Sequence, residues 1–119
     1  MPREPIEIGP DLAALLYRLS LTYCWDMKPE DALSHPMRVI RRAMDFAVWD
    51  DVLAMEAIVG RPLLTQALKT APMGALRPKS WSFWHVRLHL RGPDGEIPPE
   101  PNDRFAETDA GIIFVVRSP

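Results

Sequence analysis

The sequence predicts a mainly α-helical fold, a compact array of about five short helices over residues 1–91 followed by an extended, proline-rich arm over residues 92–119. Three observations support this prediction. Apolar residues recur every three or four positions in several segments, which is the spacing of an amphipathic helix. Thirteen prolines among 119 residues keep such helices short. A chain of this length is typical of one domain with one core.

The first helix is expected over residues 10–23. Pro10 and Asp11 are residue types that favour a helix start. Apolar residues then follow at helical spacing: Leu12, Leu15, Leu16, Leu19 and Tyr23. Residues 24–36 contain the Lys28-Pro29 break and end on another proline, so we expect a loop there with at most one short turn.

Three further helices are predicted between residues 36 and 71. Pro36 suits the first position of an amphipathic helix with Met37, Ile40, Ala43 and Met44 on one face and Arg38, Arg41, Arg42 and Asp45 on the rest. Asp50 and Asp51 lie at the next helix start, where helix capping and the helix dipole favour acidic residues. Gly60 ends that helix, and Pro62 begins one whose residues spaced for burial are Leu63, Leu64, Ala67, Leu68 and Ala71.

The segment RPKSWSFWHVRLHLR, residues 77–91, fits two periods. From Trp84 to Arg91 apolar and polar residues alternate strictly, which predicts a half-buried strand. Pro78 favours a helix start instead, and a helix would place Trp81, Trp84 and Leu88 on one stripe. These residues by themselves leave helix and strand equally open.

The arm begins with turn chemistry at Gly92-Pro93-Asp94-Gly95, and its prolines favour an extended path. It ends in the β-branched run GIIFVV, residues 111–116. That run is predicted to be a short edge strand, or an apolar tail that packs on the helices or pairs with another chain. A homo-oligomer formed through the arm is therefore one expectation.

Charge is segregated along the chain, although the net charge is only -2. Residues 1–60 and 92–119 are acidic. Residues 61–91 contain no acidic residue, and their basic residues are the candidate binding residues for a partner or a nucleic acid: Arg61, Lys69, Arg77, Lys79, Arg87 and Arg91. Either the acidic flanks neutralise this segment, which the charge balance favours, or it forms a basic face for an anionic partner.

No catalytic signature stands out, and we expect neither an enzyme nor a bound cofactor or metal. His85 and His89 have the spacing of a metal pair on a helix, but no HExxH pattern surrounds them. A lone cysteine, Cys24, is more often a small core residue than a nucleophile. The acidic residues Asp26, Glu30, Asp31, Asp50 and Asp51 could form a carboxylate pair, and capping explains the last two more simply.

The aromatic residues Trp81, Phe83 and Trp84 stand among basic ones, an arrangement that single-stranded nucleic acid can stack on. Packing in the core of a small helical domain is the stronger interpretation. With one cysteine, no apolar leader and no segment long enough to span a bilayer, the chain is expected in the cytoplasm and not in a membrane.

The segments CWDMKPEDAL, VIRRAMDFAVWDDVLAMEAIVG and LRPKSWSFWHVRLHL, within residues 24–90, resemble a family of small uncharacterised bacterial proteins. Members of that family are often encoded beside nucleotidyltransferase-type toxins of the abortive-infection kind. The resemblance implies that the Phe-Trp segment is helical, and the matching positions are Trp25, Asp26, Asp50, Asp51, Gly60, Phe83 and Trp84. Ala47 departs from the pattern, because the family tends to have glycine there. No catalytic residue is carried over.

We therefore expect a non-enzymatic protein-interaction module. Its partner would be a protein, and the resemblance implies a toxin for which this chain is the antitoxin or accessory member. The alternative is a helix-turn-helix regulator whose basic segment, residues 61–91, contacts DNA.

Overall fold

The computed structural model of the chain describes residues 6–100 and 114–116. Mainly helical architecture is confirmed. The described elements are β1 (Ile6–Ile8), α1 (Pro10–Tyr23), the 3-10 turn η1 (Pro29–Asp31), α2 (Pro36–Phe46), α3 (Trp49–Ile58), α4 (Arg61–Lys69), α5 (Pro78–Arg87) and β2 (Phe114–Val116).

Four of the five described helices have a proline at their first or second position. Pro10, Pro36 and Pro78 open α1, α2 and α5, and Pro62 is the second residue of α4. Proline is tolerated there because the amide groups of a first helical turn have no intrahelical partner. Gly60, with a φ of 88°, separates α3 from α4, a backbone conformation that favours glycine. The predicted helix starts are thus confirmed to within a residue or two.

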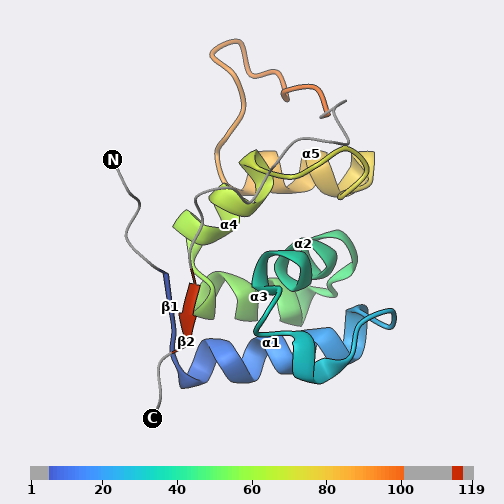
Figure 1. Cartoon of the computed structure of the whole chain (residues 1–119). Helices are drawn as coiled ribbons and strands as arrows, with labels where there is room; N and C mark the ends of the chain where they lie inside the picture. Colours follow the sequence, from blue (N-terminus) through green and yellow to red (C-terminus); the bar gives the residue numbers. More distant parts are fainter. Residues whose placement is uncertain (1–5, 101–113, 117–119) are drawn as a thin grey trace.

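The helices stack around one core (Figure 1). α1 lies at the bottom of the view and α5 at the top, with α2, α3 and α4 between them. α1 packs on α2 and α3, and α2 also packs on α4 and α5, so α2 is the central helix. The largest fully buried side chains include Trp84, Ile8, Leu16, Leu19, Ile40, Met55, Leu64 and Leu68. The predicted inward faces of α1, α2 and α4 are buried as expected.

A two-stranded parallel sheet joins the two ends of the described chain. Ile6 pairs with Phe114 and Ile8 with Val116, and the pair lies on the left edge of the molecule in Figure 1. The terminal strand predicted in GIIFVV is present over the last three residues of that run. Its partner is the chain's own β1, which the sequence did not predict.

The helix-or-strand question at residues 84–91 is settled as a helix that stops at Arg87. Trp84 and Leu88 are buried while Val86 is exposed, which is the helical pattern and not the alternating one. Leu88 is the C-cap and His89 has a φ of 57°, so the chain leaves the helix there. Trp84 donates its indole N–H to the Met44 carbonyl at 2.8 Å, which joins α5 to α2.

Two polar residues lie where their helix patterns did not place them. Arg41, expected on the polar face of α2, is buried and donates to the carbonyl of Ala67 at 3.0 Å and to the hydroxyl of Thr70 at 2.6 Å. It therefore binds the carboxyl end of α4, where a cation is favourable. Asp50 and Asp51 both lie in the first turn of α3, where acidic residues were expected, but the predicted capping is wrong, because the N-cap residue is Val48 and no side chain makes a cap hydrogen bond.

Asp51 instead forms a buried polar link to α1. Its carboxylate accepts a hydrogen bond from the Tyr23 hydroxyl at 2.6 Å and from Arg18 at 2.7 Å. The Tyr23 hydroxyl in turn accepts from the backbone N–H of Val48 at 3.2 Å. Every group in this link has a partner, as buried polar groups need.

The described parts of the arm contact the helical part. The turn at residues 92–96 closes with the Gly92 amide bonding the Glu96 carbonyl at 2.7 Å, and the indole N–H of Trp81 donates to the Pro98 carbonyl at 2.7 Å. The division into a domain of residues 1–91 and an arm of residues 92–119 stays a prediction. Within residues 6–100, none of the helices has the length and apolar character needed to cross a bilayer.

Candidate functional site: an aromatic and arginine surface

Several large apolar side chains are exposed near one another, mostly at the turn between α2 and α3 and on the outer side of α5. We call this the aromatic–arginine surface. Its apolar members are Trp25, Phe46, Val48, Trp49, Phe83 and Val86, and its cations are Arg42, Arg77, Lys79 and Arg87. Trp25 is 72% exposed and Trp49 is 53% exposed. Tryptophan is rarely left this open, because burying its ring removes a large apolar area from water.

Rings and guanidinium groups alternate across this surface. Arg42 lies 4.7 Å from the centre of the Trp25 ring, and Arg77 lies 4.3 Å from the centre of the Phe46 ring. Trp25 and Phe46 meet edge to face at 5.9 Å. Arg87 covers Trp49 in the same way at 4.7 Å. These cation–π contacts hold both partners in defined positions.

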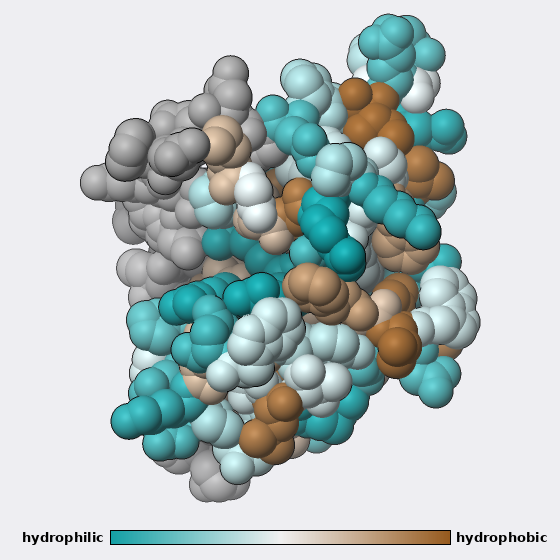
Figure 2. All heavy atoms as spheres, turned by 90° about the vertical axis from the view of Figure 1, so that its right-hand side faces the viewer, coloured by the Kyte–Doolittle hydropathy of each residue, from teal (hydrophilic) through white to brown (hydrophobic). Residues whose placement is uncertain are grey.

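Two adjoining grooves cross the surface. The larger, of about 620 Å³, lies between the α2–α3 turn and the start of α5, with Phe46, Trp49 and Arg77 in its walls. The smaller, of about 430 Å³, runs along α5 past Val86. Lys79 and Phe83 line both. The loop after α1 and the start of α5 both lie on the right-hand side of Figure 1, the side that faces the viewer in Figure 2, where brown apolar and teal hydrophilic side chains are interspersed.

Each arginine of the surface is ion-paired with a carboxylate. Arg42 contacts Asp26 at 3.3 Å, Arg77 contacts Asp45 at 3.2 Å, and Arg87 contacts Glu56 at 2.6 Å. The hydrogen bond to Glu56 raises the pKa of Arg87. Lys79 is exposed and, within the described residues, has no such carboxylate.

The pKa of Asp26 is affected by opposing influences. Partial desolvation acts to raise it, but a backbone hydrogen bond and the guanidinium groups of Arg42 and Arg38 outweigh that effect, so the pKa is lowered. Asp26 is therefore ionised at neutral pH and pairs with both arginines, at 3.0 Å for Arg38. The loop that carries Trp25 is thus attached to α2 by charge as well as by ring stacking.

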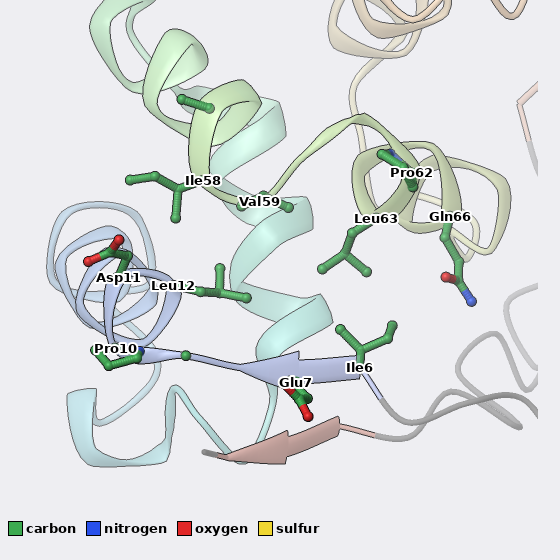
Figure 3. A pocket seen from close by; sticks show the side chains of 12 residues that line it. Ile6, Glu7, Pro10, Asp11, Leu12, Ile58, Val59, Pro62, Leu63 and Gln66 are labelled. Atoms are coloured by element: carbon green, nitrogen blue, oxygen red, sulfur yellow. The ribbon is translucent and has the colours of Figure 1, made fainter. Parts of the chain in front are cut away.

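A separate groove of about 570 Å³ lies between β1, the start of α1, the end of α3 and α4 (Figure 3). Ile6, Leu12 and Leu63 line its interior, and Asp11 and Gln66 are its polar residues beside Glu7. Among the described residues that line it there is no histidine, cysteine, lysine or arginine. The lining therefore offers carboxylates and an amide but no nucleophile and no cation for an anionic ligand.

Of the six basic residues predicted as a binding site, three meet on the aromatic–arginine surface: Arg77, Lys79 and Arg87. The other three are exposed elsewhere. Arg61 and Lys69 lie at the two ends of α4, and Arg91 follows α5. Neutralisation by the acidic flanks therefore describes part of the basic segment, because Asp45 and Glu56 from the acidic N-terminal half pair with two of its arginines. The exposed basic residues fit the other interpretation, a basic face.

The residues considered for catalysis do not assemble into a site. His85 is buried, with its Nδ1 atom 2.7 Å from the Trp81 carbonyl, whereas His89 lies beyond the helix end, so the two do not share a helix face. Burial raises the pKa of the Cys24 thiol, which disfavours the nucleophilic thiolate. Among the residues described, no three His, Cys, Asp or Glu side chains are grouped so as to hold a metal ion.

Sequence reasoning missed most of the aromatic half of the surface. Trp81 and Trp84 are core residues as expected, but Phe83 is exposed, and Trp25, Phe46 and Trp49 had not been considered as binding residues. The sequence did contain a signal for their exposure, because each of these three rings falls outside the predicted apolar stripes of its neighbouring helices.

Comparison with family models, with curated proteins and with solved structures finds no match to this chain.

Proposed function

We propose that the chain is a non-enzymatic protein-interaction module that binds a partner protein through the aromatic–arginine surface. The observation that carries this proposal is the exposure of Trp25 and Trp49 beside arginines already held in place by stacking and ion pairing. Tryptophan and arginine are enriched among the residues that contribute most to protein–protein binding. Side chains that are fixed before binding lose little conformational freedom when the partner arrives.

The charge pattern favours a protein over a nucleic acid as the partner. Arg42, Arg77 and Arg87 are each paired with a carboxylate of this chain, so their positive charge is largely compensated where phosphates would have to bind. Nucleic-acid binding depends on uncompensated cations that release counterions. Aromatic residues and arginine are instead enriched at protein interfaces.

We further propose that the partner is a toxin of the abortive-infection type and that the two proteins meet in the cytoplasm, with this chain as antitoxin or accessory member. This part rests on the resemblance of residues 24–90 to the family described above. Several positions of that resemblance lie on or beside the surface, including Trp25, Asp26 and Phe83. The proposed role needs only binding and no catalytic group.

The helix-turn-helix alternative has one observation in its favour, since Arg61 and Lys69 are exposed at the two ends of α4. It predicts binding to duplex DNA that weakens steeply with salt. Salt titration of a fluorescent duplex separates the alternatives. Affinity that falls over several decades as salt rises would favour DNA, and no binding at low salt would remove this alternative.

The proposal is tested by site-specific photo-crosslinking of the full chain in cells that contain its partner. A photoreactive residue replaces Val48 or Val86 on the surface, or Leu21 on α1 as a control. Val48 is 63% exposed and Leu21 is 57% exposed, so accessibility is matched. We expect one adduct of defined mass, containing a single partner protein, from Val48 and Val86 and none from Leu21. Equal labelling from all three positions, or no adduct, would overturn the proposal.

A further inference from the structure

The pair of grooves on the aromatic–arginine surface combines aromatic rings with charged side chains. Phe46, Trp49 and Phe83 supply rings, and Lys79 is positioned where the two grooves adjoin. Lys79 is the only cation lining these grooves that has no carboxylate partner among the described residues, since Arg77 and Arg87 are paired. A ligand that fills both grooves therefore passes Lys79.

We propose, resting on the function proposed above, that the grooves bind an acidic amphipathic helix of the partner protein. Its apolar side chains would enter between Phe46, Trp49 and Phe83, and a carboxylate next to them would pair with Lys79. A helix presents apolar and acidic residues on adjacent positions of one face, three or four residues apart, which suits two adjoining grooves.

The cations that line the grooves disfavour ligands that are themselves positively charged. A cation, including a methylated lysine that aromatic rings often bind, would meet Arg77 already stacked on Phe46 and Arg87 already stacked on Trp49. A basic helix would bring like charge to Lys79, and like charges in contact oppose binding. Asp45 also lines the larger groove, but it is paired with Arg77, so Lys79 carries the charge that no described carboxylate offsets.

The test uses two short synthetic helical peptides with the same stripe of leucine and phenylalanine, one flanked by glutamates and the other by lysines. Each is titrated into the full chain labelled with ¹⁵N. We expect the glutamate peptide to shift the amide signals of the α2–α3 turn and of α5. It should also bind more tightly than the lysine peptide by about fivefold, the upper end of what one exposed ion pair contributes.

Variants assign the preference to one side chain. K79Q should weaken binding of the glutamate peptide by up to about fivefold, and K79E should reverse the preference between the peptides. Reversal is a gain of binding that misfolding would not produce. K69Q is the matched control, because Lys69 is also an exposed lysine but lies on α4 outside both grooves, and it should leave both affinities unchanged.

Three outcomes would overturn the inference: equal binding of both peptides, no binding of either, or an unchanged preference in K79E. The proposed function can survive any of them. If crosslinks from Val48 and Val86 to a partner persist while peptide selectivity is absent, the surface is an interface and only the acidic helix is wrong. If those crosslinks are absent as well, the function itself fails.

Discussion

The hydrogen bond between Tyr23 and Asp51 joins α1 to α3, and replacing Tyr23 with phenylalanine removes it while keeping the ring. The lost hydroxyl donates to a buried carboxylate at 2.6 Å and accepts from the Val48 amide at 3.2 Å. A bond to a charged group contributes about 1.5–3 kcal/mol and a neutral one about 0.5–1.5 kcal/mol. Y23F should therefore lower the free energy of unfolding by about 2–4 kcal/mol, a large part of the total for a chain of this size.

The carboxylate side of the bond is tested by D51N. The ion pair with Arg18 adds little to the expected loss, because the Arg18 side chain is half exposed and water screens it. We expect D51N to cost about 1–3 kcal/mol, mainly by replacing a charge-assisted bond with a neutral one. Since the two residues share the bond, the double variant should be less destabilised than the sum of the single variants, by about 1–2 kcal/mol.

The pH dependence of the protein's stability follows from the direction in which folding shifts the pKa of Asp51. Burial alone would raise it, but the hydrogen bond from Tyr23 and the charge of Arg18 outweigh burial and lower it. An unfolded aspartate has a pKa of about 3.9. A lowered folded pKa stabilises the protein above that value, and this stability is lost as the pH falls through about 4 toward the folded pKa. D51N should therefore lose less stability than the wild type between pH 7 and pH 3.

Urea unfolding followed by far-ultraviolet circular dichroism measures all four proteins at both pH values. Y23F at neutral pH is the most direct measurement. Strict additivity of Y23F and D51N would show that the bond contributes nothing beyond its separate groups. The same loss of stability on acidification in D51N and the wild type would refute the role of the Asp51 charge.

Two further predictions concern the core and the surface. W84A should lower the free energy of unfolding by about 3–5 kcal/mol, because Trp84 is fully buried. W25A removes an exposed ring, so urea unfolding should show a loss of less than about 1 kcal/mol. The same W25A variant should nevertheless weaken partner capture. The reverse ranking would contradict the burial of Trp84 and the exposure of Trp25. R41M should destabilise by about 2–4 kcal/mol and speed hydrogen exchange at the α4 carboxyl end, since it removes the buried donor to Ala67 and Thr70. Unchanged exchange in α4 would contradict that role.

Local signals allowed the helices to be predicted well. Pro10 and the spacing of the leucines after it predicted α1. Pro36 is the first residue of α2, as predicted, and α4 begins one residue before the predicted start at Pro62. Such signals depend on neighbours a few residues apart, which a sequence displays directly. The opposite holds for β1, because three residues carry little periodicity and their partner strand begins at Phe114.

The candidate site was predictable only in part, because its contacts join distant segments. The basic residues Arg77, Lys79 and Arg87 were identified from composition. Their counter-charges, Asp45 on α2 and Glu56 on α3, lie 32 and 31 residues earlier in the chain and become neighbours only when the chain folds. Arg41 was misplaced for a similar reason. Its target, the carboxyl end of α4, exists only in the folded arrangement.

The parallel pairing of β1 and β2 has a mechanical consequence. Because both strands run the same way, tension applied before Ile6 and after Val116 pulls them past each other along their length. The hydrogen bonds of the pair are then loaded together and must break in one event, whereas an antiparallel pair pulled from adjacent ends opens one bond at a time. A handle attached at each end of the chain would therefore meet its first resistance at this sheet, before any helix is extended.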